Sequence, residues 1–180
     1  MSMELTETAP LDVAALPVGE LAGHLRLGTG FADDGLETPA VHSAIRAGIA
    51  VVERRTGRAL IARGFVWRPL RGAAAVPLIP VASVDAVEVV DGASRVPATG
   101  WRLTGEWMSG LPCGGRPGSV EVTLMLGFGA WDAVPADLRQ AAILISAALY
   151  EARGGVAPEM PAAAAGLMSP WRRLRVGGGA

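Results

Sequence analysis

The chain has 180 residues, 51% of them hydrophobic, with 16 arginines, no lysine, a net charge of −1 and a pI near 6.1. This length suits one domain with at most a small inserted subdomain. A chain of this size buries enough surface to fold without a disulfide or structural metal. The low pI and mostly scattered arginines disfavour a nucleic-acid-binding protein, which needs a clustered basic face. No apolar run approaches the ~20 residues that span a bilayer, so we expect no membrane segment.

The amino-terminal end is acidic and polar, unlike a secretory signal, and the lone Cys113 cannot form an internal disulfide. We therefore expect the protein to be made in a reducing cytoplasm. Charge is divided unevenly along the chain. Residues 1–37 hold seven acids and one arginine, whereas residues 38–180 hold ten acids and fifteen arginines. Surfaces of opposite charge are thus available for contacts between subunits or partners.

The first part of the chain predicts an arm followed by helices. Residues 1–16 have no periodicity, so we expect a flexible N-terminal arm. Residues 17–59 form a predicted helical part, with a short helix opened by Pro17 and a long helix over residues 38–56. Gly48 lies on the apolar face of the long helix, where the missing side chain allows close packing.

Residues 60–129 instead predict a β-subdomain of four or five short antiparallel strands. The clearest strand covers residues 120–126, where apolar residues alternate with polar ones such as Glu121. Asp91-Gly92 marks a hairpin turn. Four tryptophans lie in or beside the expected strands, and we predict that they pack in the subdomain core rather than stack on nucleic-acid bases. They are Trp67, Trp101, Trp107 and Trp131.

A second long helix is predicted over residues 135–153, within a second helical part at residues 130–154. From Ala141 to Tyr150 this helix carries one strongly polar residue, Ser146. Because a surface helix keeps a polar face, a helix that is apolar all round must be covered on every side. We expect a neighbouring subunit to supply part of that cover. The predicted subunit-interface residues are Ile143, Ala147 and Tyr150.

Together these parts predict an α+β fold, in which a helical bundle of two long helices and short terminal helices carries an inserted small antiparallel β-subdomain. Residues 155–180 follow as a C-terminal segment. Ser169-Pro170 predicts a last short helix with Trp171 and Leu174 on one face and arginines around it. Tryptophan and arginine are enriched at binding hot spots, so this segment is a candidate docking site. The alternative, that Trp171 folds back on its own subunit, stays open.

Candidate catalytic residues are few. His24 and His42 are the only histidines, and they belong to no cluster spaced like metal ligands. Cys113 lies in a glycine-rich turn, and Gly28-Thr29-Gly30 lacks the further glycine and the preceding strand of a dinucleotide loop. A chain without lysine also has no phosphate-binding Walker lysine. We therefore predict no enzyme activity, no cofactor and no metal.

Several short patterns follow one another over most of residues 17–176. They are the opening helix at 18–27, Asp33-Asp34, the helix end at 52–60, Trp67, the Val-Pro-Leu-Ile-Pro-Val of 76–81, Gly127-Phe128-Gly129, the Val-Pro-Ala-Asp-Leu-Arg-Gln-Ala of 134–141, and Tyr150-Glu151-Ala152-Arg153. In order, spacing and total length, the chain resembles the head–tail connector (adaptor) proteins of long-tailed bacteriophages, prophages and gene transfer agents.

The resemblance implies a structural virion protein in the neck of a phage or phage-like particle, with no catalytic site. Such proteins form a homo-oligomeric ring beneath the portal protein and match its twelvefold symmetry. The ring extends the DNA channel, with DNA only as passing cargo, and joins the capsid to a stopper or tail-terminator protein. Two alternatives stay open: another neck component, such as a stopper or tail-completion protein, and a small nucleic-acid-binding protein.

Within this resemblance, the C-terminal segment is the predicted portal-binding site. An aromatic anchor with a basic fringe suits an apolar groove that has an acidic rim. Deleting residues 167–180 is expected to leave the monomer folded and to abolish capture by portal-bearing heads. The apolar members of the predicted set are Leu167, Trp171 and Leu174, and the basic members are Arg172, Arg173 and Arg175.

Overall fold

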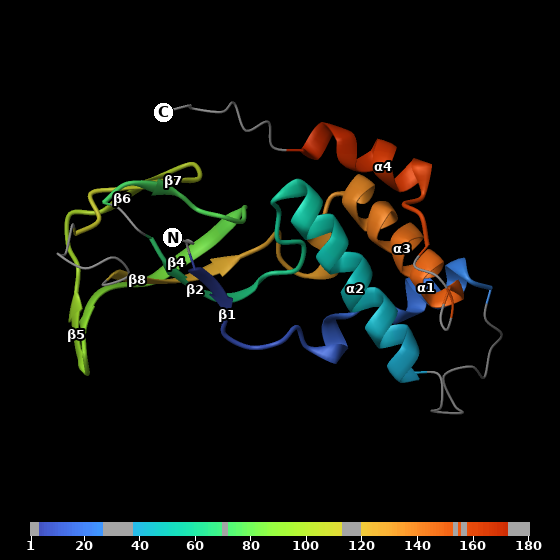
Figure 1. Ribbon diagram of the computed structural model, residues 1–180, viewed down its shortest axis with the longest axis horizontal. Helices are drawn as coiled ribbons and strands as arrows, with labels where there is room; N and C mark the ends of the chain where they lie inside the picture. The colour runs from blue at the N-terminus through green and yellow to red at the C-terminus, as the bar shows by residue number, and fades with distance from the viewer. Residues whose placement is uncertain are drawn as a thin grey trace. The chain divides into compact units, whose positions relative to one another are not determined.

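The computed structural model describes residues 4–26, 38–69, 72–112, 120–152, 155 and 158–172. Its fold is α+β, with α-helices and antiparallel sheets (Figure 1). The chain divides into two compact units. The sheet unit contains Met1–Leu11 and Ile61–Ala130, and the helical unit contains Asp12–Leu60 and Trp131–Ala180.

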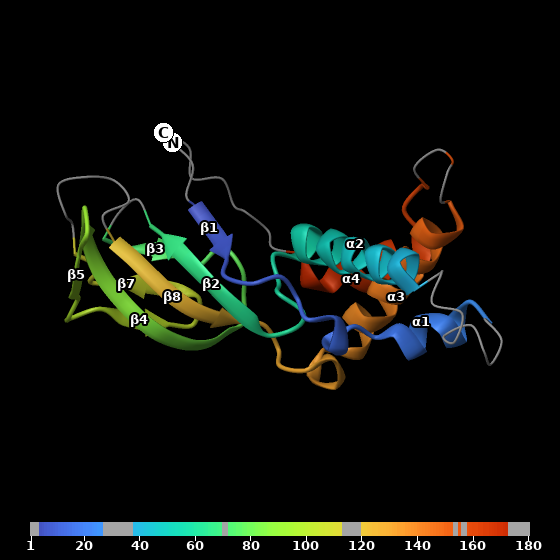
Figure 2. The same cartoon turned by 90° about the horizontal axis from the view of Figure 1, so that it is seen from below.

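The sheet unit consists of a large and a small antiparallel sheet. The large sheet has five strands in the order β1 (Glu4–Glu7), β2 (Arg63–Arg68), β8 (Val120–Leu126), β4 (Val81–Asp91) and β5 (Ser94–Pro97). The small sheet has three strands in the order β3 (Ala74–Ala75), β7 (Trp107–Ser109) and β6 (Arg102–Thr104). Figures 1 and 2 together place the small sheet over one face of the large sheet.

The centre of the large sheet is β8, whose alternating sequence suits a strand with one apolar face. Val122, Leu124 and Leu126 are fully buried, as the alternation predicts. Trp67 of β2 and Met108 of β7 are also fully buried. The apolar face of the large sheet is therefore part of the core of this unit.

The first described residues form a strand, contrary to the flexible arm expected for residues 1–16. β1 pairs with β2 in an antiparallel arrangement that sets Glu4 opposite Arg68. Ion pairs join Glu4 to Arg68 at 3.0 Å and Glu7 to Arg63 at 2.7 Å. This edge strand is held by backbone pairing and cross-strand charges rather than by an apolar face. Hydrophobic periodicity could not reveal such a strand.

The tryptophans do not all occupy the core position predicted for them. Trp67 is buried as expected, but Trp131 belongs to the helical unit, where its indole Nε1 donates a hydrogen bond to Glu20 Oε1 at 2.8 Å. Trp107 is 51% exposed. Because successive side chains of a strand point to opposite faces, the inward position of Met108 turns Trp107 outward.

The helical unit is arranged around α3, which contacts α1, α2 and α4 (Figures 1 and 2). α2 begins at the predicted Thr38-Pro39 pair, and α3 begins directly after Pro135. The described elements are α1 (Val18–His24), α2 (Thr38–Thr56), α3 (Ala136–Glu151) and α4 (Ala162–Met168), with 3-10 turns η1 (Val13–Ala15), η2 (Trp131–Ala133) and η3 (Ser169–Trp171).

The residues predicted to meet a neighbouring subunit are buried within this unit. Ile143, Ala147 and Tyr150 are each at most 6% exposed. Helices of the same chain supply the cover that a second subunit was expected to provide. The apolar character of α3 thus reflects its central position in its own unit. This corrects the subunit-interface assignment, because these three side chains leave little surface for a neighbour to contact.

α2 and α3 approach each other closely where Gly48 faces Ser146. A Cβ atom at Gly48 would overlap the Ser146 hydroxyl and would lie 2.9 Å from the carbonyl oxygen of Ala142. The Ser146 hydroxyl donates a hydrogen bond to that same oxygen at 2.7 Å, so this buried polar group is satisfied within α3. The close packing predicted for Gly48 is confirmed.

Gly48→Ala is expected to lower the free energy of unfolding by about 1–3 kcal/mol, because α2 and α3 must separate to admit the methyl group. Helix propensity alone would change stability by about 1 kcal/mol in the opposite direction. Gly166→Ala in α4 is the matched control, since a Cβ there meets no atom within 4 Å. Urea unfolding followed by circular dichroism measures both variants. Equal stability gains in the two would contradict the close contact.

Candidate assembly surfaces

A chain of ion pairs, here called the charge ladder, crosses the polar face of the large sheet. At its centre is the buried carboxylate of Glu121 on β8. Its Oε1 accepts hydrogen bonds from Nε and Nη2 of Arg68 at 2.9 and 2.7 Å, and its Oε2 accepts one from Nη1 of Arg95 at 2.6 Å. Arg68 also donates to Glu4 at 3.0 Å, and Arg95 donates to Glu88 at 3.2 Å. Acids and arginines therefore link all five strands.

The charge ladder perturbs the ionisation of its central groups. Hydrogen bonds from Arg68 and then from Arg95 hold the pKa of Glu121 below its ordinary value, although burial acts in the opposite direction. Hydrogen bonds to Glu121 raise the pKa of both arginines. These arginines are thus committed to carboxylates of their own sheet, and the ladder serves to hold the strands together.

The described part of the predicted docking segment, which ends at Arg172, contacts Arg58 and α3 of its own subunit through Trp171. The Arg58 guanidinium lies over the half-buried Trp171 ring, 4.9 Å from its centroid. The indole Nε1 also donates to Oδ2 of Asp137 at 3.4 Å. Trp171 therefore folds back on its own subunit, which is the alternative that the sequence left open.

The other members of the predicted portal-binding set differ in position. Leu167 is half-buried and Arg172 is exposed, while Met168 between them is 2% exposed. Deleting residues 167–180 would therefore remove a core side chain together with any docking contact. We no longer expect that deletion to leave the monomer intact. The remaining members, Arg173, Leu174 and Arg175, lie outside the described residues.

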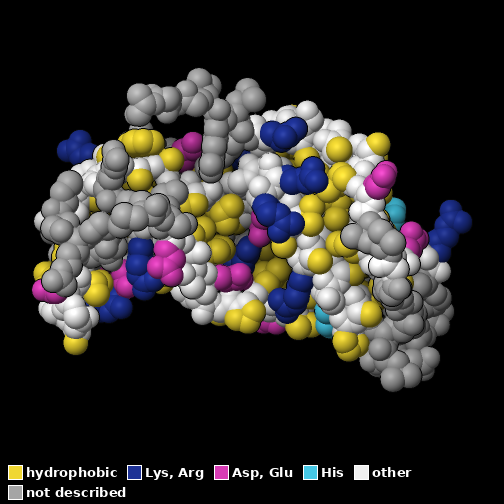
Figure 3. Space-filling view, in the orientation of Figure 1, with side chains coloured by type: hydrophobic (Ala, Val, Ile, Leu, Met, Phe, Trp, Pro, Cys, Tyr) yellow, Lys and Arg dark blue, Asp and Glu magenta, His cyan; other side chains and the backbone are white. Residues whose placement is uncertain are grey.

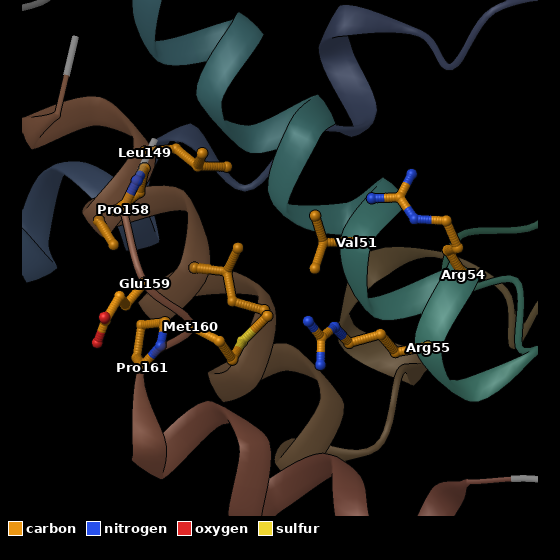
Figure 4. A pocket seen from close by; sticks show the side chains of 10 residues that line it. Val51, Arg54, Arg55, Leu149, Pro158, Glu159, Met160 and Pro161 are labelled. Atoms are coloured by element: carbon orange, nitrogen blue, oxygen red, sulfur yellow. The ribbon is translucent and has the colours of Figure 1, made fainter. Parts of the chain in front are cut away.

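An open groove of about 250 Å³ lies between α2, α3 and residues 158–161 (Figure 4). Its apolar lining includes Val51 of α2, Leu149 of α3 and Met160. Arg54, Arg55 and Glu159 add charged groups. The groove therefore combines an apolar surface with cations from the end of α2, and we call it the Arg54–Arg55 groove.

The two arginines of this groove differ from those of the charge ladder. Arg54 and Arg55 are exposed in the last turn of α2, where the helix dipole favours positive charge. Neither forms an ion pair with any residue in the described part of the chain. Figure 3 shows arginine and apolar side chains side by side on this face of the helical unit. Such a surface suits a partner that offers apolar and acidic groups.

Within the described ranges, no group of three or more His, Cys, Asp or Glu side chains could hold a metal ion. His42 lies on α2 and His24 on α1, and Cys113 lies outside the described residues. Of the helices that the structure describes, none is long and apolar enough to cross a bilayer.

Comparison with solved structures finds matches along almost the whole chain. A chain in the neck of an empty gene transfer agent (GTA) particle, computed with C6 symmetry, has 41% sequence identity and a TM-score of 0.86 over 98% of this chain and 99% of that chain. A chain in the virion of the native GTA particle has 41% identity and a TM-score of 0.79, with the same coverage of both chains. A chain in the neck of the native particle, computed with C12 symmetry, has 35% identity and a TM-score of 0.79 over 99% of each chain.

The chain belongs to the neck proteins of gene transfer agent particles. As a GTA neck protein, it is a structural component located in the neck of the particle, as the sequence resemblance predicted. The sixfold and twelvefold symmetry of the neck structures supports assembly as a ring of many subunits. No family model matches the sequence, and no curated protein matches it.

The charge ladder predicts that the neck protein loses stability in acid. The folded-state pKa of Glu121 lies below its unfolded value, so the ionised carboxylate stabilises the fold above the unfolded pKa. That contribution is lost in the window that begins at the ordinary glutamate pKa and extends down through the lowered folded pKa as the pH falls. Glu121→Gln should lower the urea midpoint at neutral pH and flatten its decline in this window. Glu7→Gln, which alters one exposed ion pair, is the control and should keep the wild-type profile.

Trp171→Ala is expected to destabilise the helical unit by about 1–3 kcal/mol, because it removes a partly buried indole and a cation–π contact. Trp171→Phe keeps a ring beneath Arg58 and should retain most of the stability. Thermal unfolding measures both effects. A Trp171→Ala protein of wild-type stability that failed to bind heads would instead identify Trp171 as a docking anchor.

Proposed function

We propose that this neck protein is the head–tail adaptor, a ring beneath the portal that extends the DNA channel and joins the capsid to the next neck or tail protein. The observation that carries the proposal is the likeness, over 98% or more of the chain, to chains of GTA necks computed with C6 and C12 symmetry. A twelvefold ring would match the portal symmetry that the connector resemblance implies. The proposed ring therefore contains about twelve copies.

The fold supports an adaptor over the other neck components considered. A stopper or tail-completion protein is expected to be mainly β, whereas this chain builds a complete helical unit around α3. Each subunit also has two compact units, the sheet unit with its paired charge ladder and the helical unit with the Arg54–Arg55 groove. A protein that joins two different partners can present one unit to each.

We further propose that the C-terminal segment contacts the portal from Arg172 onward. Arg58 and Asp137 hold the Trp171 side chain on the helical unit, so Trp171 supports the base of the segment. The exposed Arg172 follows directly. Clustered arginines favour an acidic portal surface, and leucines on either side would add apolar contacts. In sequence, the segment then contributes Arg173, Leu174 and Arg175, with Leu167 before it.

The other proposed partner is a stopper or tail-terminator protein on the opposite side of the ring. DNA passes through the channel as cargo, and the ring does not bind it sequence-specifically. The charge ladder agrees with this proposal, because Arg68 and Arg95 are bound to carboxylates and are not available as a phosphate-binding row.

Removing residues 173–180 tests portal docking without removing Met168 or Trp171 from the helical unit. The truncated protein should unfold at the wild-type temperature, while its capture by portal-bearing heads should fall about tenfold or more, since a ring multiplies each lost contact. Arg172→Glu should act in the same direction. Arg102→Glu, an exposed arginine of the sheet unit, is the matched control. Undiminished capture by the truncated protein would place the docking surface elsewhere.

Native mass measurement of the protein alone and with portal rings separates the adaptor from its alternatives. An adaptor should bind portal rings directly, in about twelve copies per ring. A stopper should bind only after another neck ring is in place. A small nucleic-acid-binding protein would instead show DNA affinity that falls steeply with salt concentration.

A further inference from the structure

We propose that neighbouring subunits of the ring are joined by Trp107 of one copy, which enters the Arg54–Arg55 groove of the next copy. This inference rests on the ring assembly proposed above. It concerns the contact between two copies of the chain, and it does not depend on how the ring binds the portal.

About half of the Trp107 side chain is exposed, and this exposed indole surface does not contribute to the core of a single subunit. It lies on β7, directly after the turn at Gly105, and is 51% exposed while its neighbour Met108 is fully buried. Among the described residues, the large hydrophobic side chains exposed to this degree are Val13, Val96 and Trp107. Trp107 is the aromatic member of that set. Tryptophan buries a large area on binding and is strongly enriched at interface hot spots.

The Arg54–Arg55 groove has the chemistry that an indole prefers. Met160 supplies a thioether, and sulfur–aromatic contacts are favourable. Val51 and Leu149 add aliphatic surface. The Arg55 side chain points toward Met160 (Figure 4), so its guanidinium stands where it can lie over an aromatic ring.

The same chain already holds one tryptophan by these interactions. Arg58 lies over the Trp171 ring at 4.9 Å, and Asp137 accepts the indole N–H at 3.4 Å. In the groove, an arginine would lie over the indole ring as Arg58 does at Trp171. The exposed carboxylate of Glu159 would accept the indole N–H as Asp137 does. The groove therefore repeats the elements of an indole site and has room for a ring.

The charges beside Trp107 and at the Arg54–Arg55 groove are of opposite sign, which also favours contact between them. Glu106 directly precedes Trp107 at the hairpin turn and is exposed. When the indole enters the groove, this carboxylate is carried to the rim that holds Arg54 and Arg55. A carboxylate–guanidinium contact there would be charge-assisted and would fix the orientation of the hairpin.

Ring symmetry favours a second copy as the occupant. In a cyclic ring, each contact joins two different patches of identical subunits, so one subunit must carry both a projecting group and its receptor. This chain carries Trp107 on the sheet unit and the groove on the helical unit. One repeated contact of this kind is sufficient to close a ring.

Disulfide crosslinking in assembled particles tests the contact directly. In a Cys113→Ser background, cells produce two variants together, one with Thr104→Cys beside Trp107 and one with Pro158→Cys at the groove. Mild oxidation should link two chains, and each variant produced alone should give no linked pair. Because each chain has one cysteine, the bond must join two copies. Val96→Cys in place of Thr104→Cys is the matched control and should not link to the groove.

Side-chain removal tests the energetics of the same contact. Trp107→Ala, and separately Arg54→Glu with Arg55→Glu, should each raise the concentration needed for half-maximal ring formation about tenfold or more. Combining them should add little, because both changes disrupt one contact. Val96→Ala is the control and should assemble normally. Thermal unfolding of each variant measures the accompanying change in monomer stability. Val96→Ala should leave it unchanged, while Trp107→Ala loses the buried half of the indole and the reversed charges oppose the dipole of α2, so both should lower it by a few degrees.

If the two cysteine variants assemble together into normal rings but no disulfide forms between Thr104→Cys and Pro158→Cys, the proposal is overturned. The proposal is also overturned if the Trp107→Ala protein forms normal rings that fail only to join tails, since Trp107 would then contact another neck protein. The adaptor proposal fails separately, if a correctly crosslinked ring does not bind portal-bearing heads. The two outcomes are distinguishable because the crosslink reports contacts between copies whether or not a portal is bound.

Discussion

The helical unit depends on the burial of α3 by the other helices of the same subunit. Burying a large aliphatic side chain contributes about 1.5–3 kcal/mol, and α3 carries several around its circumference. α2 reaches it closely because Gly48 has no side chain and because Ser146 bonds to its own helix. α4 adds further cover through Ala164 and Met168, which are almost fully buried. The start of the C-terminal region is therefore part of the core and not a detachable appendage.

The sheet unit depends in a comparable way on one buried charge. Glu121 occupies the polar face of the central strand, and a buried carboxylate is costly unless it is paired and hydrogen-bonded. Arginines from strands on both sides provide those bonds, so the charge ladder links strands that come from distant parts of the sequence. For assembly, the arginines therefore fall into two groups, those already paired within the subunit and those still available to a partner. Those of the ladder are paired, whereas Arg54 and Arg55 have no ion pair in the described part of the chain.

The parts of this fold that can be predicted from sequence have local signals. Alternation identifies β8, a Thr-Pro pair begins α2, and the position of Gly48 on an apolar face indicates close packing. β1 has no such signal, because cross-strand ion pairs join residues about 60 positions apart and do not appear in local periodicity. The pattern of α3 shows that it is buried but not what buries it. Two short helices, which carry few periodic residues, supply cover that a second subunit was expected to provide.

The same limit applies to the candidate site. The arginine clusters and Trp171 are visible in the sequence, but a cluster does not show whether a cation is already paired. Trp171 is held by Arg58, which lies 113 positions earlier. The outward position of Trp107 follows from which face of a three-stranded sheet is covered, and no local pattern records that choice. Met160 lies in a segment between prolines that has no periodicity, although it completes the Arg54–Arg55 groove.

The order of elements along the chain connects the two units in a way that suits an adaptor. The chain passes three times between the units, and the last passage leads from β8 to α3. The central strand of one core is therefore followed along the chain, after the 3-10 turn η2, by the central helix of the other. A substitution that weakens β8 therefore acts on the strand from which the chain enters the helical core. In the proposed adaptor ring, whose subunits would contact one another and two further partners, this linkage keeps both sets of surfaces on one folded subunit.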